Sequence, residues 1–122
     1  MSDKQQLGKW GEERARIYLE RKGVKILDSN FRTPYGELDL IGLEDSQVVF
    51  FEVKTRSSDA FGFGEQSITK KKQEHLIDSA EAYIQEHPHL GEDWRIDAIV
   101  IDGNPSRKKN IIRWFKNAIS GD

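Results

Sequence analysis

The stretch GELDLIGLEDSQVVFFEVKTR, residues 36–56, decides the expected fold of this chain. It is the most apolar part of the sequence, yet Asp39, Glu52 and Lys54 interrupt it. Charged side chains are rarely placed among buried strands without a partner, an ion or a chemical role. Glu52 and Lys54 are two residues apart and therefore share one face of their strand. Two carboxylates beside a lysine can hold a divalent metal ion and activate water next to a phosphate.

The same stretch predicts a hairpin in which residues 37–43 and 47–55 are strands joined by a turn at 45–46. A two-residue turn places Asp39 directly opposite Glu52. Opposed carboxylates repel and destabilise a sheet, so this register makes physical sense if a cation lies between them. A longer loop would shift the register. The other face of the pair is expected to be wholly apolar and to carry Leu38, Leu40, Val49, Phe51 and Val53.

The remaining elements indicate an α/β domain that covers residues 1–122. Apolar residues recur with helical spacing before Gly23 and again between Thr69, a plausible helix cap, and Pro88. The resulting order is αβββαβ plus a terminal strand, which predicts a mixed sheet with flanking helices rather than a sandwich or a bundle. The expected helices are 4–22 and the segment after Thr69, and the other expected strands are 24–31, 94–101 and 111–115.

Composition limits the class of protein. Charged residues make up 33% of the 122 residues and hydrophobic ones 36%, as in a globular domain. The net charge of −2 means that a nucleic-acid surface would have to be a local basic patch. The absence of cysteine excludes disulfides and zinc–thiolate sites. We see no signal peptide or membrane span in the sequence, so we expect a cytoplasmic protein that does not enter membranes.

The charged residues also carry a family resemblance. An aspartate followed by Glu-Val-Lys on the next strand, after a helix with Gly-Glu, resembles the PD-(D/E)XK nuclease superfamily. Over nearly its whole length the chain is similar to the YraN-like family of bacterial proteins. The first acid stands in GELD, without the proline of the superfamily's nominal motif, as is ordinary in this branch. The matching segments are GKWGEERA (8–15), NFRTPYGELDLI (30–41), FFEVKTR (50–56), residues 61–72 and WRIDAIVI (94–101).

The resemblance implies a restriction-endonuclease-like core and an endonuclease that cleaves phosphodiester bonds in DNA with Mg²⁺ or Mn²⁺. The implied core is similar to that of archaeal Holliday-junction resolvases, which suggests branched or structured DNA as substrate. Asp39 and Glu52 would be metal ligands, with the backbone carbonyl of Val53 as another. Lys54 would orient or help to deprotonate the attacking water, or stabilise charge on the phosphate.

A helix glutamate would complete the implied site. Glu12 matches the Gly-Glu of the family, and Glu13 is the alternative, because helical geometry alone does not choose between them. Further candidates for contacts with nucleic acid lie after the second strand of the hairpin and near the start of the second helix: Arg56, Gln66, Lys70 and Lys72.

Two functions stay open at the level of the sequence. The first is a metal-dependent nuclease, and the second is a catalytically silent module that binds nucleic acid or protein with the same fold. The intact set of two acids and a lysine favours the first. The mildly acidic net charge and the lack of a long basic stripe keep the second open, since phosphate contacts normally drive affinity. A homodimer would combine two basic patches, and Trp10, Phe61 and Phe63 are candidates for its surface.

Overall fold

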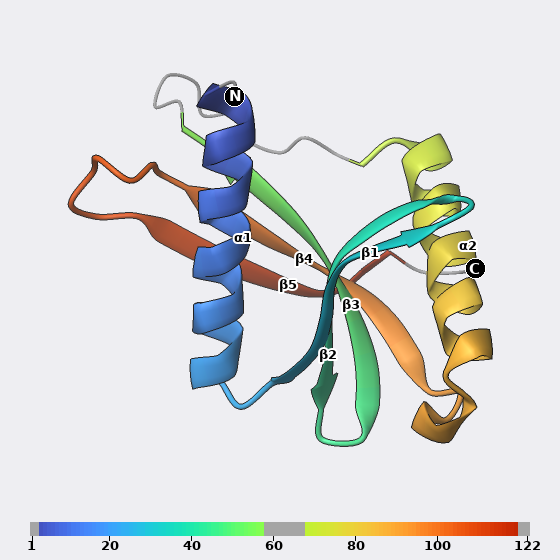
Figure 1. Ribbon diagram of the computed structural model, residues 1–122. Coiled ribbons are helices and arrows are strands. Elements are labelled where there is room, and N and C mark those ends of the chain that lie inside the picture. The colour runs from blue at the N-terminus through green and yellow to red at the C-terminus, as the bar shows by residue number, and fades with distance from the viewer. Residues whose placement is uncertain (1–2, 58–67, 120–122) are drawn as a thin grey trace.

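The computed structural model describes residues 3–57 and 68–119 as two helices, a short 3₁₀ turn and one five-stranded sheet (Figure 1). The strand order is β1-β2-β3-β4-β5, with β3 and β4 parallel and the other neighbours antiparallel. The predicted mixed sheet is confirmed, and the architecture is consistent with a restriction-endonuclease-like fold. The elements are α1 (Asp3–Arg21), β1 (Lys25–Thr33), β2 (Gly36–Glu44), β3 (Gln47–Arg56), α2 (Lys70–Glu86), η1 (Pro88–Leu90), β4 (Trp94–Asp102) and β5 (Ile111–Ile119).

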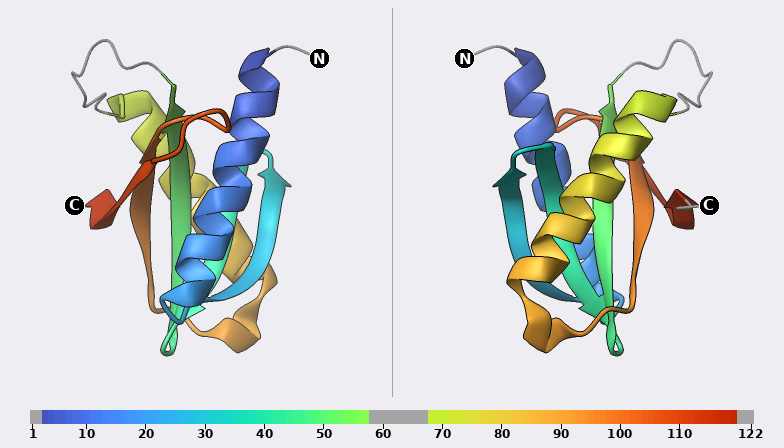
Figure 2. Two further views of the ribbon diagram at one scale, coloured as in Figure 1. Left: turned by 90° about the vertical axis from the view of Figure 1, so that its left-hand side faces the viewer. Right: turned by 90° about the vertical axis from the view of Figure 1, so that its right-hand side faces the viewer.

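The two helices cover opposite faces of the sheet, as both views of Figure 2 show. Each face therefore has its own apolar cluster. The α1 side includes Ala15, Leu19, Leu40, Val49, Phe51, Ile99 and Ile101. The α2 side includes Leu38, Ile41, Val48, Phe50, Leu76, Ala80, Tyr83 and Ile96. Because both faces are covered, a charged side chain on β2 or β3 is drawn out of water unless it lies at an end of the sheet.

The predicted hairpin register is confirmed from the turn as far as Leu40 and Phe51, but the predicted pairing of Asp39 with Glu52 is not part of the ladder. Glu44 pairs with Gln47, and the ladder continues to Leu40 and Phe51. Asp45 has φ 57°, the left-handed backbone that a tight two-residue hairpin turn requires.

Beyond that ladder the sheet forks. The β1–β2 pairing continues to Thr33 and Gly36, and the β3–β4 pairing continues to Arg56 and Asp102, while β2 and β3 no longer pair with each other. Figure 1 shows the β1–β2 arm bending toward α2 while β3 continues in the other direction. Asp39 and Glu52 are the first residues past the ladder on their strands. We call the place where these two residues lie the fork.

The prediction that Leu38 and Leu40 share one apolar face of β2 is wrong. Leu38 packs in the α2-side cluster and Leu40 in the α1-side cluster, although regular alternation would place both on one face. The β1–β2 register passes over Asn30 and Asp39, and Asn30 has φ 48°. The side of the sheet on which β2 buries its leucines therefore changes between Leu38 and Leu40, at Asp39.

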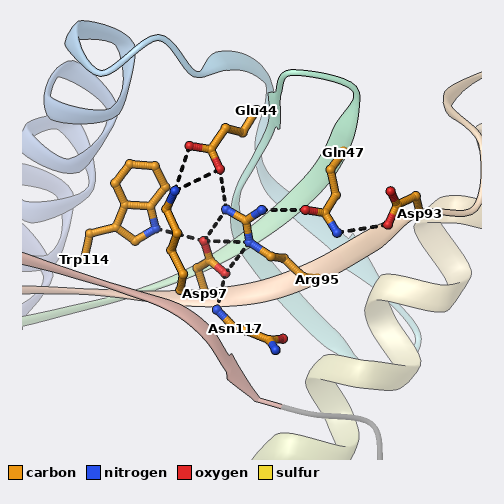
Figure 3. Close-up of polar contacts among 8 residues, drawn as sticks. Glu44, Gln47, Asp93, Arg95, Asp97, Trp114 and Asn117 are labelled. Carbon is orange, nitrogen blue, oxygen red and sulfur yellow. Dashed lines mark hydrogen bonds and ion pairs between the residues drawn. The ribbon is translucent and has the colours of Figure 1, made fainter.

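The last strand is longer than predicted, because β5 runs to Ile119 instead of stopping at Phe115. Figure 3 shows what holds its second half. The Asp97 carboxylate is fully buried and accepts the indole N–H of Trp114 at 2.8 Å and the backbone N–H of Asn117 at 2.7 Å. Arg95 donates to the same carboxylate and also to Glu44 at 2.6 Å. This network ties β5 to β4 and to the end of β2.

No helix in the two described segments is long and apolar enough to cross a membrane.

Candidate functional site at the fork

The fork holds two carboxyl groups side by side. The backbone N–H of Val53 donates to Asp39 Oδ2 at 2.9 Å, which holds the aspartate against β3 just beside Glu52. Asp39 is half-buried and Glu52 is only 8% exposed. The two acids predicted as metal ligands are therefore brought together where the β2–β3 ladder stops.

The environment of Asp39 opposes its negative charge. Burial and the neighbouring charge of Glu52 raise the pKa of Asp39 to about 8, and the more distant charge of Glu12 acts in the same direction. The hydrogen bond from Val53 acts the opposite way but is outweighed. A cation between the acids would reverse the balance, because an opposite charge within a few ångströms favours the ionised form.

Lys72 supplies the cation that the protein itself brings to this site. Its Nζ lies 3.4 Å from Glu52 Oε2, and its side chain remains about half exposed (51%). Lys72 sits in the first turn of α2, whose start is fixed by Thr69, the predicted cap, which accepts the Lys72 N–H at 3.2 Å. The sequence suggested Lys72 for nucleic-acid contacts and did not suggest that it neutralises Glu52.

The helix glutamates differ clearly in their surroundings. Glu12 Oε1 accepts the Asn30 amide at 3.0 Å, so Glu12 faces the sheet beside the fork. Glu13 instead pairs with Arg16 on the outer surface of α1. Between the two candidates that the sequence left open, the structure places Glu12 near Asp39.

Glu12 reaches the sheet because α1 lies very close to β3. A Cβ atom added at Gly11 would fall 1.8 Å from Thr55 Oγ1. The Gly-Glu pair therefore has a geometric reason: glycine allows the close approach, and the next residue carries the carboxylate.

The predicted lysine and arginine of β3 lie beyond the acids. Lys54 is half-buried and lines a cavity of about 680 Å³ on the α2 side of the sheet. Arg56 lies 3.8 Å from Asp102 in an ion pair. Lys70 is exposed at the first residue of α2.

The other sequence candidates have less bearing on the site. Gln66, Phe61 and Phe63 lie outside the described residues. Trp10 is half-buried against the α1-side cluster, so it is less available for a dimer surface than the sequence suggested.

The donor set fits a hard divalent ion that keeps much of its own water. Within residues 3–57 and 68–119, no three His, Cys, Asp or Glu side chains are close enough together to hold a metal ion by themselves. Magnesium is commonly bound by one or two carboxylates plus waters and substrate phosphate oxygens. Asp39 and Glu52 supply that minimum, and their mutual repulsion would be relieved by the ion.

Known relatives match the chain over most of its length. It is 45% identical over 102 residues to the UPF0102 protein of Sulfurihydrogenibium sp., covering 84% of this chain and 89% of the relative. It is 42% identical to the UPF0102 protein of Syntrophomonas wolfei, over 90% of this chain and 97% of the relative. It is 41% identical to the UPF0102 protein of Nitrosomonas europaea, over 97% of each chain. Among solved structures, SfsA of Pyrococcus furiosus in complex with Ca²⁺ aligns with a TM-score of 0.45 at 16% identity, over 97% of this chain and 65% of that chain.

The model of Uncharacterised protein family UPF0102 matches residues 11–101, from the glycine that lets α1 approach β3 to the end of the buried part of β4. That range contains every acid at the fork. The chain belongs to the UPF0102 family, as its resemblance to the YraN-like proteins predicted.

Proposed function

We propose that this protein is a Mg²⁺- or Mn²⁺-dependent nuclease that hydrolyses phosphodiester bonds in DNA. One observation carries the proposal: Asp39 and Glu52 lie side by side at the fork, with burial raising the pKa of Asp39. Directly adjacent carboxylates in a half-buried position are destabilising unless they serve a ligand. Strongly perturbed acids are also typical of functional sites.

The acids at the fork would bind the metal ion. When bound, the ion supplies a Lewis acid for the phosphate and a water of lowered pKa. Asp39 and Glu52 would provide the two carboxylate ligands, and the Val53 carbonyl is the proposed third. Glu12 would bind an outer water of the ion, because its carboxylate faces the fork from α1 while Asn30 holds it in place.

The lysines would act on the reacting atoms. Lys54 follows Glu52 on the same face of β3 and is half-buried, which suits a group that orients the attacking water or stabilises charge on the phosphate. Lys72 would keep Glu52 neutralised before the ion arrives and would turn to the phosphate afterwards. Its half-exposed side chain leaves room for that movement.

A silent binding module is the alternative function. The ion pair between Lys72 and Glu52 favours it, because a lysine already meets part of the charge that a metal ion would meet. The net charge of −2 also gives little general attraction to DNA. The module would keep its affinity for nucleic acid when the acids are replaced.

Cleavage assays with matched variants test the proposal. Labelled junction, flap, single-stranded and duplex DNA are incubated with the parent, Asp39→Asn, Lys54→Ala and Glu37→Gln in Mg²⁺, in Mn²⁺ and in EDTA. Glu37 is a suitable control, since it is a carboxylate two residues from Asp39 on β2 whose partner is Arg32 at 3.9 Å. We expect cleavage by the parent and Glu37→Gln only, and only with metal.

Equal cleavage by all four proteins would indicate a contaminating nuclease and would overturn the site. No cleavage by the parent on any substrate, with DNA binding unchanged in Asp39→Asn, would favour the silent module. Titration with Mn²⁺ gives a second readout, because Asp39→Asn should lose the binding that Glu37→Gln keeps.

A further inference from the structure

A sheet surface beside the fork has no assigned role. On the α2 side of the sheet, Glu52 neighbours Ala98 on β4, which in turn neighbours Phe115 on β5. Phe115 is a large apolar side chain with 46% of its surface exposed. The row thus runs from a buried acid, over a small residue, to an open aromatic ring.

The next row along the strands is basic. Lys54 neighbours Val100, and Val100 neighbours Arg113. Arg113 is held by Asp102 at 2.5 Å, and Asp102 is also the partner of Arg56. Two cations therefore share the Asp102 carboxylate, and Lys54 adds a third cation to this face, a local positive excess on a chain whose total charge is −2.

The two rows form a hollow, which we call the β5 groove: Lys54, Arg56, Ala98, Val100, Arg113 and Phe115. Its volume is about 680 Å³. Ala98 and Val100, which make its floor, are buried but belong to neither apolar cluster of the described residues. Ile68, just before α2, and Gln73, in the first turn of α2, also line the groove.

We propose that the β5 groove binds an unpaired segment of a nucleic-acid strand next to the site of cleavage. A base would stack on Phe115, and phosphates would lie against Lys54 and Arg113. Aromatic platforms combined with cationic grooves are how proteins hold single strands without reading their sequence. This inference rests on the proposed function, since it names the form of nucleic acid that the fork receives.

The geometry favours an unpaired strand over a duplex. β5 is two strands away from β3, about 10 Å at the usual strand spacing, so Phe115 is within reach of nucleotides near Glu52. A base can stack on a side chain only after it has left its own stack, and duplex bases remain inside the helix. The same edge strand could instead contact a second copy of the chain, and the test below separates these occupants.

Fluorescence anisotropy with labelled oligodeoxythymidine in EDTA measures the groove without cleavage. Phe115→Leu keeps an apolar side chain but removes the ring face, and we expect roughly tenfold weaker binding. Phe115→Tyr should keep the parent affinity. Tyr35→Leu is the matched control, because Tyr35 is a similarly exposed aromatic residue (49%) outside the groove. Arg113→Gln should lower the slope of affinity against salt by about 0.7, as for one lost phosphate contact.

The inference is overturned if Phe115→Leu binds like the parent, or if blunt duplex competes as well as the single strand. It is also overturned if the parent is a dimer in sedimentation and Phe115→Leu only makes it a monomer. Failure of the nuclease is distinguishable: absence of cleavage in Mg²⁺ with Phe115-dependent binding intact supports the groove and removes the proposed activity. Cleavage that persists while binding ignores Phe115 removes the groove alone.

Discussion

The carboxylate of Asp39 accepts the backbone N–H of Val53 at 2.9 Å, across the point where β2 and β3 stop pairing. A side-chain oxygen thus takes the position at which a backbone carbonyl would have continued the ladder. The contact ends the strand pairing and fixes one carboxylate beside another. The same hydrogen bond therefore lies at the end of the strand pairing and at the pair of carboxylates.

Asp39→Asn is expected to stabilise the metal-free protein at neutral and alkaline pH. The pKa of Asp39 is raised to about 8 in the folded state, against about 3.9 in an unfolded chain. Between these values the unfolded chain has released a proton that the folded chain keeps, so the free energy of unfolding of the parent falls as pH rises from about 4 to about 8. Asparagine does not titrate, and its amide oxygen can still accept the Val53 N–H.

Urea denaturation in EDTA at about pH 5 and about pH 8.5 measures this effect. The difference between the two pH values should be smaller in Asp39→Asn than in the parent, and Glu37→Gln should resemble the parent. Mn²⁺ should stabilise the parent, since it binds only the folded state, and should leave Asp39→Asn unchanged. A parent protein whose stability rises over this pH range would contradict the raised pKa.

Lys72→Gln is expected to tighten the binding of Mn²⁺. The ammonium group lies 3.4 Å from Glu52 Oε2, where it competes with an incoming cation. A half-exposed ion pair contributes about 0.2–1 kcal/mol, so the gain should not exceed about fivefold. Calorimetric titration measures it, with Lys70→Gln as the control from the exposed start of the same helix. Weaker binding in Lys72→Gln would mean that the lysine supports the ion instead of competing with it.

Gly11→Ala is expected to destabilise the protein by about 1–3 kcal/mol, although alanine is the better helix former by about 1 kcal/mol. The new Cβ would meet Thr55 Oγ1 at 1.8 Å and Thr55 Cβ at 2.9 Å, so α1 has to move away from β3. Glu12 would move with it. Gly8→Ala is the matched control, since nothing lies within 4 Å of its added Cβ and it should be neutral or stabilising.

Thermal unfolding measures both alanine variants. Adding Thr55→Ala to Gly11→Ala should recover part of the lost stability, because it removes the closest atom. If Gly11→Ala is as stable as Gly8→Ala, the close approach of α1 is not required for folding.

Arg95→Met is expected to cost roughly 3–5 kcal/mol, the usual effect of removing one partner of a buried ion pair. Asp97 is fully buried, and loss of the guanidinium would leave its charge with the neutral donors of Trp114 and Asn117. Arg16→Met on the surface of α1 is the control and should cost about 0–1 kcal/mol. Equal stability of the two variants in urea denaturation would show that the network contributes little.

Local pattern was sufficient to predict the elements and the hairpin. When apolar residues alternate on both sides of a two-residue turn, only one register keeps the apolar side chains of both strands on the same face. The ladder from Glu44–Gln47 to Leu40–Phe51 has that register. The Thr69 cap and the stop before Pro88 depend on neighbours in the sequence, so they were also predictable.

Irregular backbone could not be predicted from periodicity. Alternation placed Leu38 and Leu40 on one face, but the two leucines pack on opposite faces of the sheet, on either side of Asp39, whose side chain bonds to β3. The same limit applies to β5, whose second half is held through Asp97 on another strand.

Contacts between distant segments were the other gap. Lys72 is 20 positions beyond Glu52, with the undescribed residues 58–67 between them, and no spacing rule relates a helix start to a strand acid. The basic row of the β5 groove was missed for the same reason. Lys54 becomes a neighbour of Val100 through the parallel pairing of β3 with β4, and Arg113 becomes a neighbour of the same residue through the antiparallel pairing of β4 with β5.

The acids at the fork and the residues of the β5 groove come from different parts of the chain. Glu12, Asp39 and Glu52 all come from the part before β4, whereas Arg113 and Phe115 come from the last strand. An edge strand has only one neighbour, so its outward side chains can change with little disturbance of the rest of the sheet. Under the proposed function, substitutions on β5 would therefore change which nucleic-acid strand is held and would leave the acids at the fork in place.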